Sequence, residues 1–113
     1  MSCIFCRIAA GEIPAKMVLE DDHVVAFHDL NPAAPLHVLV IPRRHVENVA
    51  SAEAGDGELL GRVLLACRQV AEQCGVAQGG YRVVLNNNAD AGQSVPHLHA
   101  HVLGGRSLGW PPG

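Results

Sequence analysis

Residues 96–105 read Pro96-His97-Leu98-His99-Ala100-His101-Val102-Leu103-Gly104-Gly105. In this run three histidines alternate with apolar residues. Because successive side chains of a β-strand point to opposite faces, an alternation with period two predicts a strand. The histidines would share one face, and the leucine, alanine and valine between them would share the other. The stretch therefore predicts a strand with one reactive face and one face in the core.

Three interpretations of the histidine row compete. A strand advances about 3.3 Å per residue, so His97 and His101 would lie about 13 Å apart; two neighbours could share a metal ion, but all three would need severe bending. Three unrelated surface histidines are a second interpretation, which requires three of the seven histidines to fall together by chance. An imidazole with a pKa of about 6.5 can attack or transfer a proton near neutral pH, which favours acid/base or nucleophilic work.

The length and composition of the chain limit its architecture. One domain over residues 1–113 is long enough for a hydrophobic core but buries a limited share of its surface. A hydrophobic content of 49%, with 17% charged residues, is high for a small monomer and favours a homodimer. The formal net charge of -3 and the lack of a basic stripe argue against nucleic acid and favour a small charged ligand.

The sequence predicts neither a membrane protein nor a secreted one. No apolar run approaches the ~20 residues of a membrane span, and the first residues lack the basic and apolar regions of a secretory signal. Four cysteines could form two disulfides in a secreted protein, but the expected location is the cytoplasm, which keeps thiols reduced. Core or metal-binding roles are therefore expected for the cysteines.

Hydrophobic spacing and terminal residues predict two helices. Ser2 can cap a short helix over residues 3–10, which Gly11 would end. The inward face of this helix is expected to carry Ile4, Phe5 and Ile8. Apolar residues at helical spacing from Leu60 to Cys74, followed by Gly75, predict one long amphipathic helix. On its packing face, Cys67 and Cys74 are interpreted as core thiols.

Five strands are expected as well. Residues 16–20 and 24–28 flank an Asp-Asp turn and would pair as an antiparallel hairpin, on which His23 and His28 are interpreted as bystanders. The nearly all-apolar residues 37–42 predict a central strand buried on both faces. Residues 81–86 and the histidine stretch supply the fourth and fifth strands, joined by a polar loop. Five antiparallel strands with one long and one short helix make an α+β domain.

The histidine stretch resembles the signature of the histidine triad (HIT) family, in which three histidines alternate with apolar residues. Further similarities point to the Hint branch, whose members are nucleoside phosphoramidases: Asn86, Gly92-Gln93-Ser94, Gly104-Gly105-Arg106 and Trp110-Pro111-Pro112-Gly113. The resemblance covers essentially the whole chain, as a single HIT domain over residues 1–113. It implies that two subunits pair and continue the five-stranded antiparallel sheet across a homodimer.

The resemblance also implies catalytic roles. The middle histidine of the motif, His99, would be the nucleophile and would form a transient nucleotidyl-histidine that water resolves. His101 would help to hold the phosphate, and His37 would support the same centre from the buried strand. Ser94 would donate to the phosphate or to the leaving group. No catalytic cofactor is implied.

Substrate contacts are implied in three places. The backbone of Gly92 and Gln93, together with Asn86, would donate to phosphate oxygens, although residues 92–94 could also be an ordinary surface loop. Asp29 and Leu30 match ribose and base contacts of the family; a loop cap and a core leucine are the alternative. An apolar purine slot would be formed by Phe5, Ile8, Ile13, Phe27 and Leu30, with a simple core role for the phenylalanines as the alternative.

The pair Cys3-x-x-Cys6, together with His45, forms a second constellation. A spacing of three residues puts both thiols on one face at the start of a helix, where the dipole favours thiolates. A closed tetrahedral zinc site needs two more ligands. Some bacterial members of the wider family recruit two histidines at the matching positions, so the resemblance implies a structural zinc held by Cys3, Cys6, His45 and His97. A redox or core role is the alternative for the cysteines.

With this resemblance, the expected function is hydrolysis of purine nucleoside phosphoramidates, in which AMP or GMP is linked to an amine. A nucleotidyl transferase or a dinucleotide hydrolase, as in sister branches, is the alternative within enzymes. A nucleotide-binding interaction module with vestigial catalysis is an alternative of another class. The presence of His37 together with all three histidines of the row argues against a complete loss of chemistry.

Overall fold

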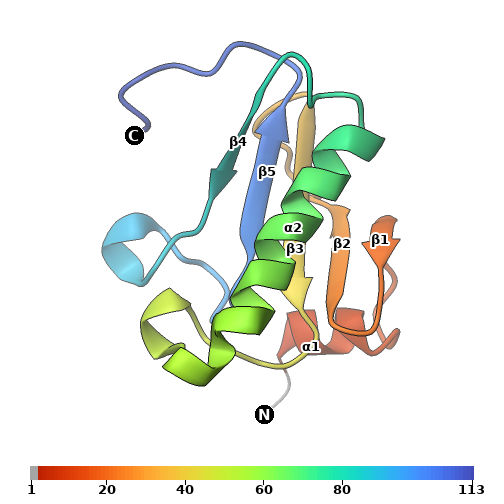
Figure 1. Ribbon diagram of the computed structural model, residues 1–113, viewed down its shortest axis with the longest axis vertical. Coiled ribbons are helices and arrows are strands. Elements are labelled where there is room, and N and C mark those ends of the chain that lie inside the picture. The colour runs from red at the N-terminus through yellow and green to blue at the C-terminus, as the bar shows by residue number, and fades with distance from the viewer. Residues whose placement is uncertain (1–2) are drawn as a thin grey trace.

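The computed structural model describes residues 3–113 and shows a five-stranded antiparallel sheet with two helices (Figure 1). The helices are α1 (Ile4–Ala9) and α2 (Gly57–Gln73), and the strands are β1 (Met17–Glu20), β2 (Val24–His28), β3 (Leu36–Pro42), β4 (Tyr81–Val84) and β5 (Ala100–Gly104). The strand order β1-β2-β3-β5-β4 leaves β1 and β4 at the edges. The predicted α+β class is therefore confirmed.

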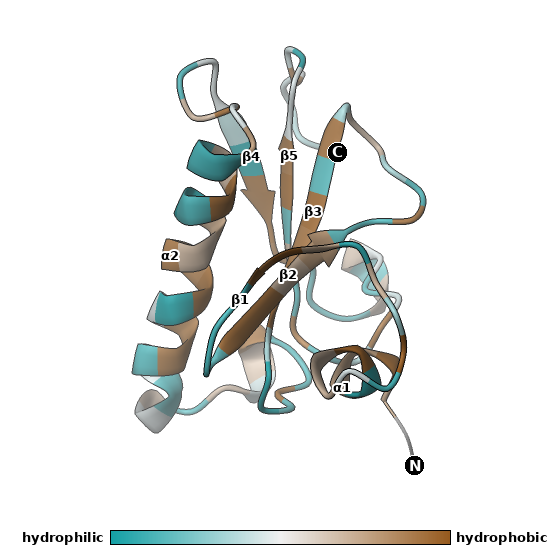
Figure 2. Ribbon diagram, turned by 90° about the vertical axis from the view of Figure 1, so that its right-hand side faces the viewer, coloured by the Kyte–Doolittle hydropathy of each residue, from teal (hydrophilic) through white to brown (hydrophobic). Residues whose placement is uncertain are grey.

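The two helices lie on opposite faces of the sheet (Figure 2). Against the inner side of α2, the fully buried side chains of β3 and β5 form the larger core, and each such side chain contributes roughly 1.5–3 kcal/mol. Burial raises the pKa of Cys67 to about 11, so this residue is a neutral thiol in the core, as predicted. Cys74 is half-buried and packs against the same core.

On the other face, α1 packs Phe5 against Phe27, Leu39 and Ile41. The cap of α1 differs from the prediction: the thiol of Cys3 accepts a hydrogen bond from the backbone N–H of Cys6 at 3.4 Å. Ser2, the predicted cap, lies outside the described residues.

The prediction that Ile4 faces inward is wrong, because this side chain is 50% exposed. Residues three positions apart share a helix face, so Phe5 and Ile8 pack inward together, whereas Ile4 is turned by about 100° from Phe5. Three strand ends also differ by small margins. β1 begins one residue later than expected, at Met17, and β3 begins one residue earlier, at Leu36. β4 ends two residues earlier, at Val84.

The histidine strand is shorter than the sequence predicts. β5 begins at Ala100, so His97 and His99 precede the strand instead of lying within it. The chain leaves the ladder because the N–H of Leu98 donates to the carbonyl of Val46 at 2.6 Å, in the segment that follows β3. The period of two is nevertheless preserved across this break, since Leu98 packs in the α2 core with the alternate residues of β5.

The histidine rings lie on the α1 face, as the alternation predicts. The ring centroid of Phe5 is 5.9 Å from that of His97 and 5.2 Å from that of His99. The ring of His99 is in turn 5.0 Å from that of His101. Within residues 3–113, no helix has the length and apolar character that crossing a bilayer requires.

Candidate active site

A cavity of about 290 Å³ opens on the α1 face of the sheet, and we call it the histidine cavity. Its wall comes from α1, β2, the loop after β2 and the residues around the start of β5. The sequence analysis assigned many of these residues to catalysis or substrate binding: Phe5, Ile8, Ile13, Phe27, Asp29, Leu30, Ser94, His99 and His101. The predicted purine slot and two catalytic histidines therefore line one cavity. Phe5 and Phe27 are also buried, so their wall and core roles coincide.

His99 offers an unprotonated nitrogen at this wall. Its Nδ1 lies 2.7 Å from the main-chain carbonyl oxygen of His97. Because a carbonyl only accepts, Nδ1 carries the hydrogen and Nε2 of the neutral ring keeps its lone pair. The edge-on contact with Phe5 fixes the plane of the ring. A held imidazole with a free lone pair has the properties of a nucleophile.

A relay of hydrogen bonds sets the opposite protonation pattern in His101. The N–H of Ala33 donates to His37 Nδ1 at 3.0 Å, so the hydrogen of His37 is on Nε2. That Nε2 lies 2.9 Å from His101 Nδ1, to which it donates. His101 therefore carries its own hydrogen on Nε2. This buried Nε2 has no hydrogen-bond partner within residues 3–113.

His101 is neutral at physiological pH. Burial, followed by the nearby His99 and His37, lowers the pKa of His101 from the ordinary 6.5 to about 4, and the opposing effect of Asp29 is smaller. An unpartnered buried donor is costly unless a ligand satisfies it. The neutral Nε2–H is thus a preorganised donor for an oxygen atom of a ligand in the cavity.

Asp29 braces the loop between β2 and β3 in addition to lining the cavity. One carboxylate oxygen accepts from the N–H of Asn31 at 2.7 Å, and the other lies 3.5 Å from His37 Nε2. The main-chain N–H of Asp29 donates to the carbonyl of His37 at 3.0 Å. Its side chain is 22% exposed and lines the cavity.

The loop before the histidines uses its polar groups differently from the prediction. The N–H groups of Gly92 and Gln93, expected to donate to phosphate, donate within the loop to Ala89 and Asn88 at 2.9 and 3.1 Å. These bonds close the short 3-10 turn at Ala89–Ala91. Neither residue lines the histidine cavity, and Asn86 does not line it either.

The side chain of Gln93 ties the loop to neighbouring segments. Its carbonyl accepts from the N–H of Asn88 at 2.9 Å, and its amide donates to the carbonyls of Glu47 and Val95 at 2.8 and 3.1 Å. Of the predicted Gly-Gln-Ser motif, only Ser94 therefore reaches the cavity. Gln93 instead fixes where Ser94 is held.

The four predicted metal ligands converge at the start of α1. The Nδ1 atom of His97 lies 3.2 Å from the sulfur of Cys3 and 3.5 Å from that of Cys6, and 3.1 Å from Nδ1 of His45. All four donor atoms lie within 4.8 Å of one another. Zinc bound at its usual bond lengths holds tetrahedral ligands about 3.3–3.8 Å apart, so this donor set fits the ion.

The orientation of His97 also suits a metal ligand. Its Nε2 lies 2.9 Å from the carbonyl oxygen of Pro42, which places the hydrogen on Nε2 and the lone pair on Nδ1, toward the cysteines. Burial lowers the pKa of His97, which favours the neutral ring that metal binding requires. The first histidine of the row therefore belongs to a different cluster from the other two.

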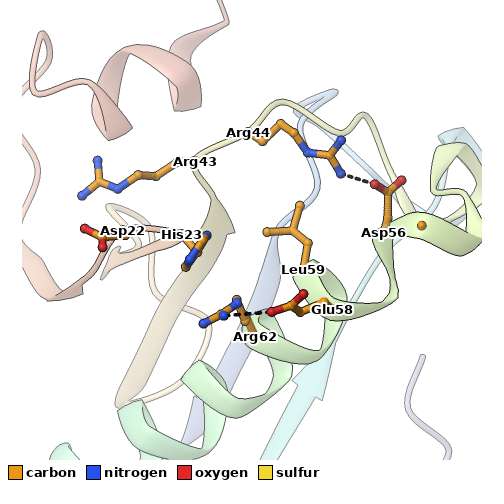
Figure 3. Close-up of a pocket in the computed structure, with 9 residues that line it drawn as sticks. Asp22, His23, Arg43, Arg44, Asp56, Glu58, Leu59 and Arg62 are labelled. Atoms are coloured by element: carbon orange, nitrogen blue, oxygen red, sulfur yellow. Dashed lines mark hydrogen bonds and ion pairs between the residues drawn. The ribbon is translucent and has the colours of Figure 1, made fainter.

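A larger cleft of about 580 Å³ lies between the turn before β2, the residues after β3 and the start of α2 (Figure 3). Its charged groups neutralise one another: Arg44 pairs with Asp56, and Arg62 with Glu58 at 2.9 Å. None of the residues predicted for catalysis lines it. The histidine cavity is therefore the candidate active site despite its smaller volume.

The sequence analysis missed several wall residues of the histidine cavity. His28, interpreted as a bystander, lines it, as does Lys16, which directly precedes β1. The remaining additions are Ile4, Pro14, Ala15, Asn31, Leu39 and Val95. The position of His28 directly before Asp29 could have indicated that it lines the cavity, whereas nothing in the sequence around the apolar wall residues indicates this.

The chain matches a known family over most of its length. The family described as HIT domain matches residues 10–108. A HIT-like protein of Synechocystis is 48% identical over 110 residues, which are 97% of this chain and 96% of that protein. A HIT-like protein of Synechococcus elongatus is 50% identical over 110 residues, with the same shares of the two chains.

Solved structures agree with this match. A HIT family hydrolase from Legionella pneumophila superposes with a TM-score of 0.97 at 46% identity, covering 99% of this chain and 100% of that chain. A histidine triad protein from Clostridium difficile gives 0.93 at 43% identity, covering 96% and 95%. A histidine triad nucleotide-binding protein from Candida albicans gives 0.83 at 31% identity, covering 97% and 83%.

Proposed function

The chain belongs to the HIT domain family, and we propose that it hydrolyses purine nucleoside phosphoramidates, as in the Hint branch. The observation that supports this function is the opposite protonation of two adjacent histidines in one cavity. His99 offers a lone pair on Nε2, and His101 offers an unpartnered N–H. A phosphorus centre between them would meet a nucleophile and a donor to its oxygens.

The proposed reaction has two steps. The lone pair of His99 Nε2 attacks the α-phosphorus while the phosphorus–nitrogen bond breaks, and its electron pair leaves with the amine. A proton from water, relayed through the hydroxyl of Ser94, neutralises the departing amine. A second water then attacks the phosphorus and gives one proton, through Ser94, to the hydroxide left by the first step, while the phosphorus–Nε2 bond returns its electron pair to His99. In total one water is consumed, with its oxygen on the nucleotide.

We propose a purine nucleotide, AMP or GMP, as the ligand of this cavity. The apolar wall formed by Phe5, Ile8 and Phe27 suits a base, and Leu30 at the rim is 91% exposed and free to cover it. Asp29 is placed to accept hydrogen bonds from ribose hydroxyls. Neutral His101 and Ser94, which line the same cavity, would then contact the phosphate.

The test is a substrate panel with purified protein. AMP and GMP joined to a fluorogenic amine are compared with dinucleoside polyphosphates and with simple AMP binding. Release of the amine, with AMP attached to His99 in acid-quenched mass spectra, is the expected result. Preferred cleavage of dinucleotides would indicate a sister activity, and AMP binding without turnover would indicate an interaction module. Either outcome contradicts the proposal.

We further propose that Cys3, Cys6, His45 and His97 hold a structural zinc ion. The supporting observations are their mutual distances and the lone pair that Pro42 directs toward the cysteines. Such an ion would join α1 to the segment after β3 and to the approach to β5. Metal analysis of untagged, reduced protein is expected to give one zinc per chain. A zinc content near zero would remove this site.

We also propose a homodimer that pairs the β4 edges of two sheets. β4 is an unpaired edge strand, and an open edge favours pairing with a second strand. On α2, Leu64 and Leu65 are 53% and 58% exposed, and Trp110 is 82% exposed. Light scattering at micromolar concentration should report a dimer, and Leu65→Glu should weaken it while Asp22→Asn, in the exposed turn before β2, does not. A monomeric parent protein would contradict the proposal.

A further inference from the structure

A second cavity of about 550 Å³, which we call the outer cavity, adjoins the histidine cavity. Ile4, Ser94 and Val95 line both, so the two spaces share one wall. The rest of the outer cavity is lined by Cys3, His45, Glu47 and Pro96. A ligand bound in the histidine cavity could therefore extend past Ser94 into the outer cavity.

This adjacency at Ser94 indicates where a leaving group that passes over the shared wall would lie, if the proposed function holds. In an in-line displacement the leaving atom departs on the side opposite the nucleophile. His99 lines only the histidine cavity, whereas Ser94 lies on the boundary of the two spaces. With the phosphorus between His99 and Ser94, the amine would point into the outer cavity.

Glu47 is the only acidic residue among the residues that line the outer cavity. Its main chain is held in place, because its carbonyl accepts from the Gln93 amide at 2.8 Å and the neighbouring Val46 carbonyl accepts from Leu98 at 2.6 Å. Its carboxylate forms no ion pair with any residue from 3 to 113. A fixed backbone thus presents an unneutralised negative charge.

Apolar residues line the outer cavity beside the Glu47 carboxylate. Ile4, Val95 and Pro96 offer only hydrocarbon to the outer cavity. The metal cluster at its edge would add no net charge, because two thiolates balance a divalent ion. An alkyl chain that ends in an ammonium group would match both features of this cavity.

We propose that the outer cavity binds the leaving amine and selects amines that carry a second, protonated amino group at the end of a short alkyl chain. The alkyl chain contacts Ile4, Val95 and Pro96, and the terminal ammonium pairs with Glu47. The inference rests on the proposed phosphoramidase function and adds the chemical class of the leaving group.

The test measures binding in a protein that cannot turn over its ligand. His99→Ala, with His99→Asn as a second variant, is titrated calorimetrically with AMP joined through nitrogen to diaminopentane, pentylamine or aminohexanoate. We expect the diaminopentane conjugate to bind about three- to fivefold tighter than the pentylamine conjugate, which is the contribution of one exposed ion pair. The aminohexanoate conjugate should bind most weakly, and added salt should reduce the differences.

Variants of Glu47 assign the preference to its carboxylate. In the His99→Ala background, Glu47→Gln should abolish the discrimination and Glu47→Lys should reverse it. Glu72→Gln is the matched control, since Glu72 is an acidic residue on the exposed side of α2 and lines neither cavity. It should leave the three affinities unchanged.

The outcomes separate this inference from the function on which it rests. Equal affinity for the three conjugates, or a preference that survives Glu47→Gln, overturns the leaving-group inference. Hydrolysis by the parent protein is measured independently, so its absence overturns the proposed function even when the ammonium preference is present. Failure of every conjugate to bind at millimolar concentration overturns both.

Discussion

His97 and His99 are two residues apart and both are buried, but their rings offer opposite nitrogens. His97 directs the lone pair of Nδ1 to two cysteines and a histidine, whereas His99 keeps its lone pair on Nε2. In each ring, a main-chain carbonyl accepts a hydrogen bond from one nitrogen, so the lone pair is on the other. The carbonyl of Pro42 does this for His97, and the carbonyl of His97 does it for His99. One repeated residue therefore serves two kinds of chemistry through its backbone partners.

The two histidines are also linked. The carbonyl that orients His99 belongs to the residue whose side chain joins the metal cluster. Main-chain hydrogen bonds of this kind fix ring orientation and tautomer without any further side chain. The proposed metal cluster would therefore support the position of the proposed nucleophile without reaching the histidine cavity itself, since only His99 and His101 of the row line that cavity.

The largest expected effect is on turnover. His99→Ala removes the proposed nucleophile and should lower kcat by roughly 10,000-fold or more, while AMP binding and zinc content stay unchanged. The measurement is single-turnover amine release together with calorimetric AMP binding. Activity within about tenfold of the parent, the scale of lost positioning help, would contradict the role of His99.

The next largest effect is on stability, and it follows from loss of the proposed zinc ion that His97 helps to hold. Removing zinc with a chelator, or replacing Cys6 by Ser, should destabilise the fold by about 4 kcal/mol if free zinc had exceeded its Kd a thousandfold. Thermal unfolding reports the loss, and the rate per folded molecule should change far less than after His99→Ala. Cys74→Ser, a half-buried thiol outside the cluster, is the control. If chelation lowered the rate per folded molecule in the same proportion as the stability, the result would contradict separate roles for His97 and His99.

A third effect is the pH dependence that His101 imposes. An unfolded chain holds this histidine at the ordinary pKa of 6.5, and the folded chain at about 4. Between these values the unfolded state binds more protons, so stability is lost as pH falls from about 6.5 to about 4, by at most about 3 kcal/mol. Urea unfolding at several pH values should show a flatter profile for His101→Asn. An unchanged profile would contradict the buried, neutral state of His101.

Much of this architecture could be predicted from side-chain patterns. The Asp-Asp turn predicts the β1–β2 hairpin, and the apolar residues 37–42 predict a central strand, because both depend on local sequence and burial. The alternation of residues 97–102 predicts the two faces correctly. The cysteine spacing and the family resemblance together named a quartet whose donor atoms do meet in the structure.

The orientation of the site could not be predicted in this way. The acceptors that orient the site are the main-chain carbonyls of Val46, Pro42 and His97, and a carbonyl is present at every residue whatever the sequence. For the same reason the late start of the histidine strand, at Ala100, and the hydrogen bond that the Gly92 N–H donates within its own loop cannot be read from residue types. The sequence thus indicates which side chains do chemistry, and the backbone determines which atom each one offers.

The smallest expected effect concerns Phe5, whose ring edge contacts both His97 and His99. Phe5→Leu keeps much of the apolar volume but removes both ring contacts, so it should cost about 1 kcal/mol of stability. Because the ring of His99 is then held less firmly, kcat should fall several-fold with little change in zinc content. Phe27→Leu is the matched control, since Phe27 packs against Phe5 at 5.6 Å and lines the same cavity.

The comparison of the two phenylalanines decides whether Phe5 acts through the histidines or only through packing. A merely structural role predicts that both variants lose stability and activity in the same proportion. If Phe5 positions His99, only Phe5→Leu should lower kcat, while Phe27→Leu should change stability and the KM for the purine nucleotide. The double variant Phe5→Leu/Phe27→Leu completes a cycle, and because the two rings touch, their stability losses should not add. Equal kcat values for the two single variants would leave the orientation of the His99 ring to the His97 carbonyl alone and would contradict a positioning role for Phe5.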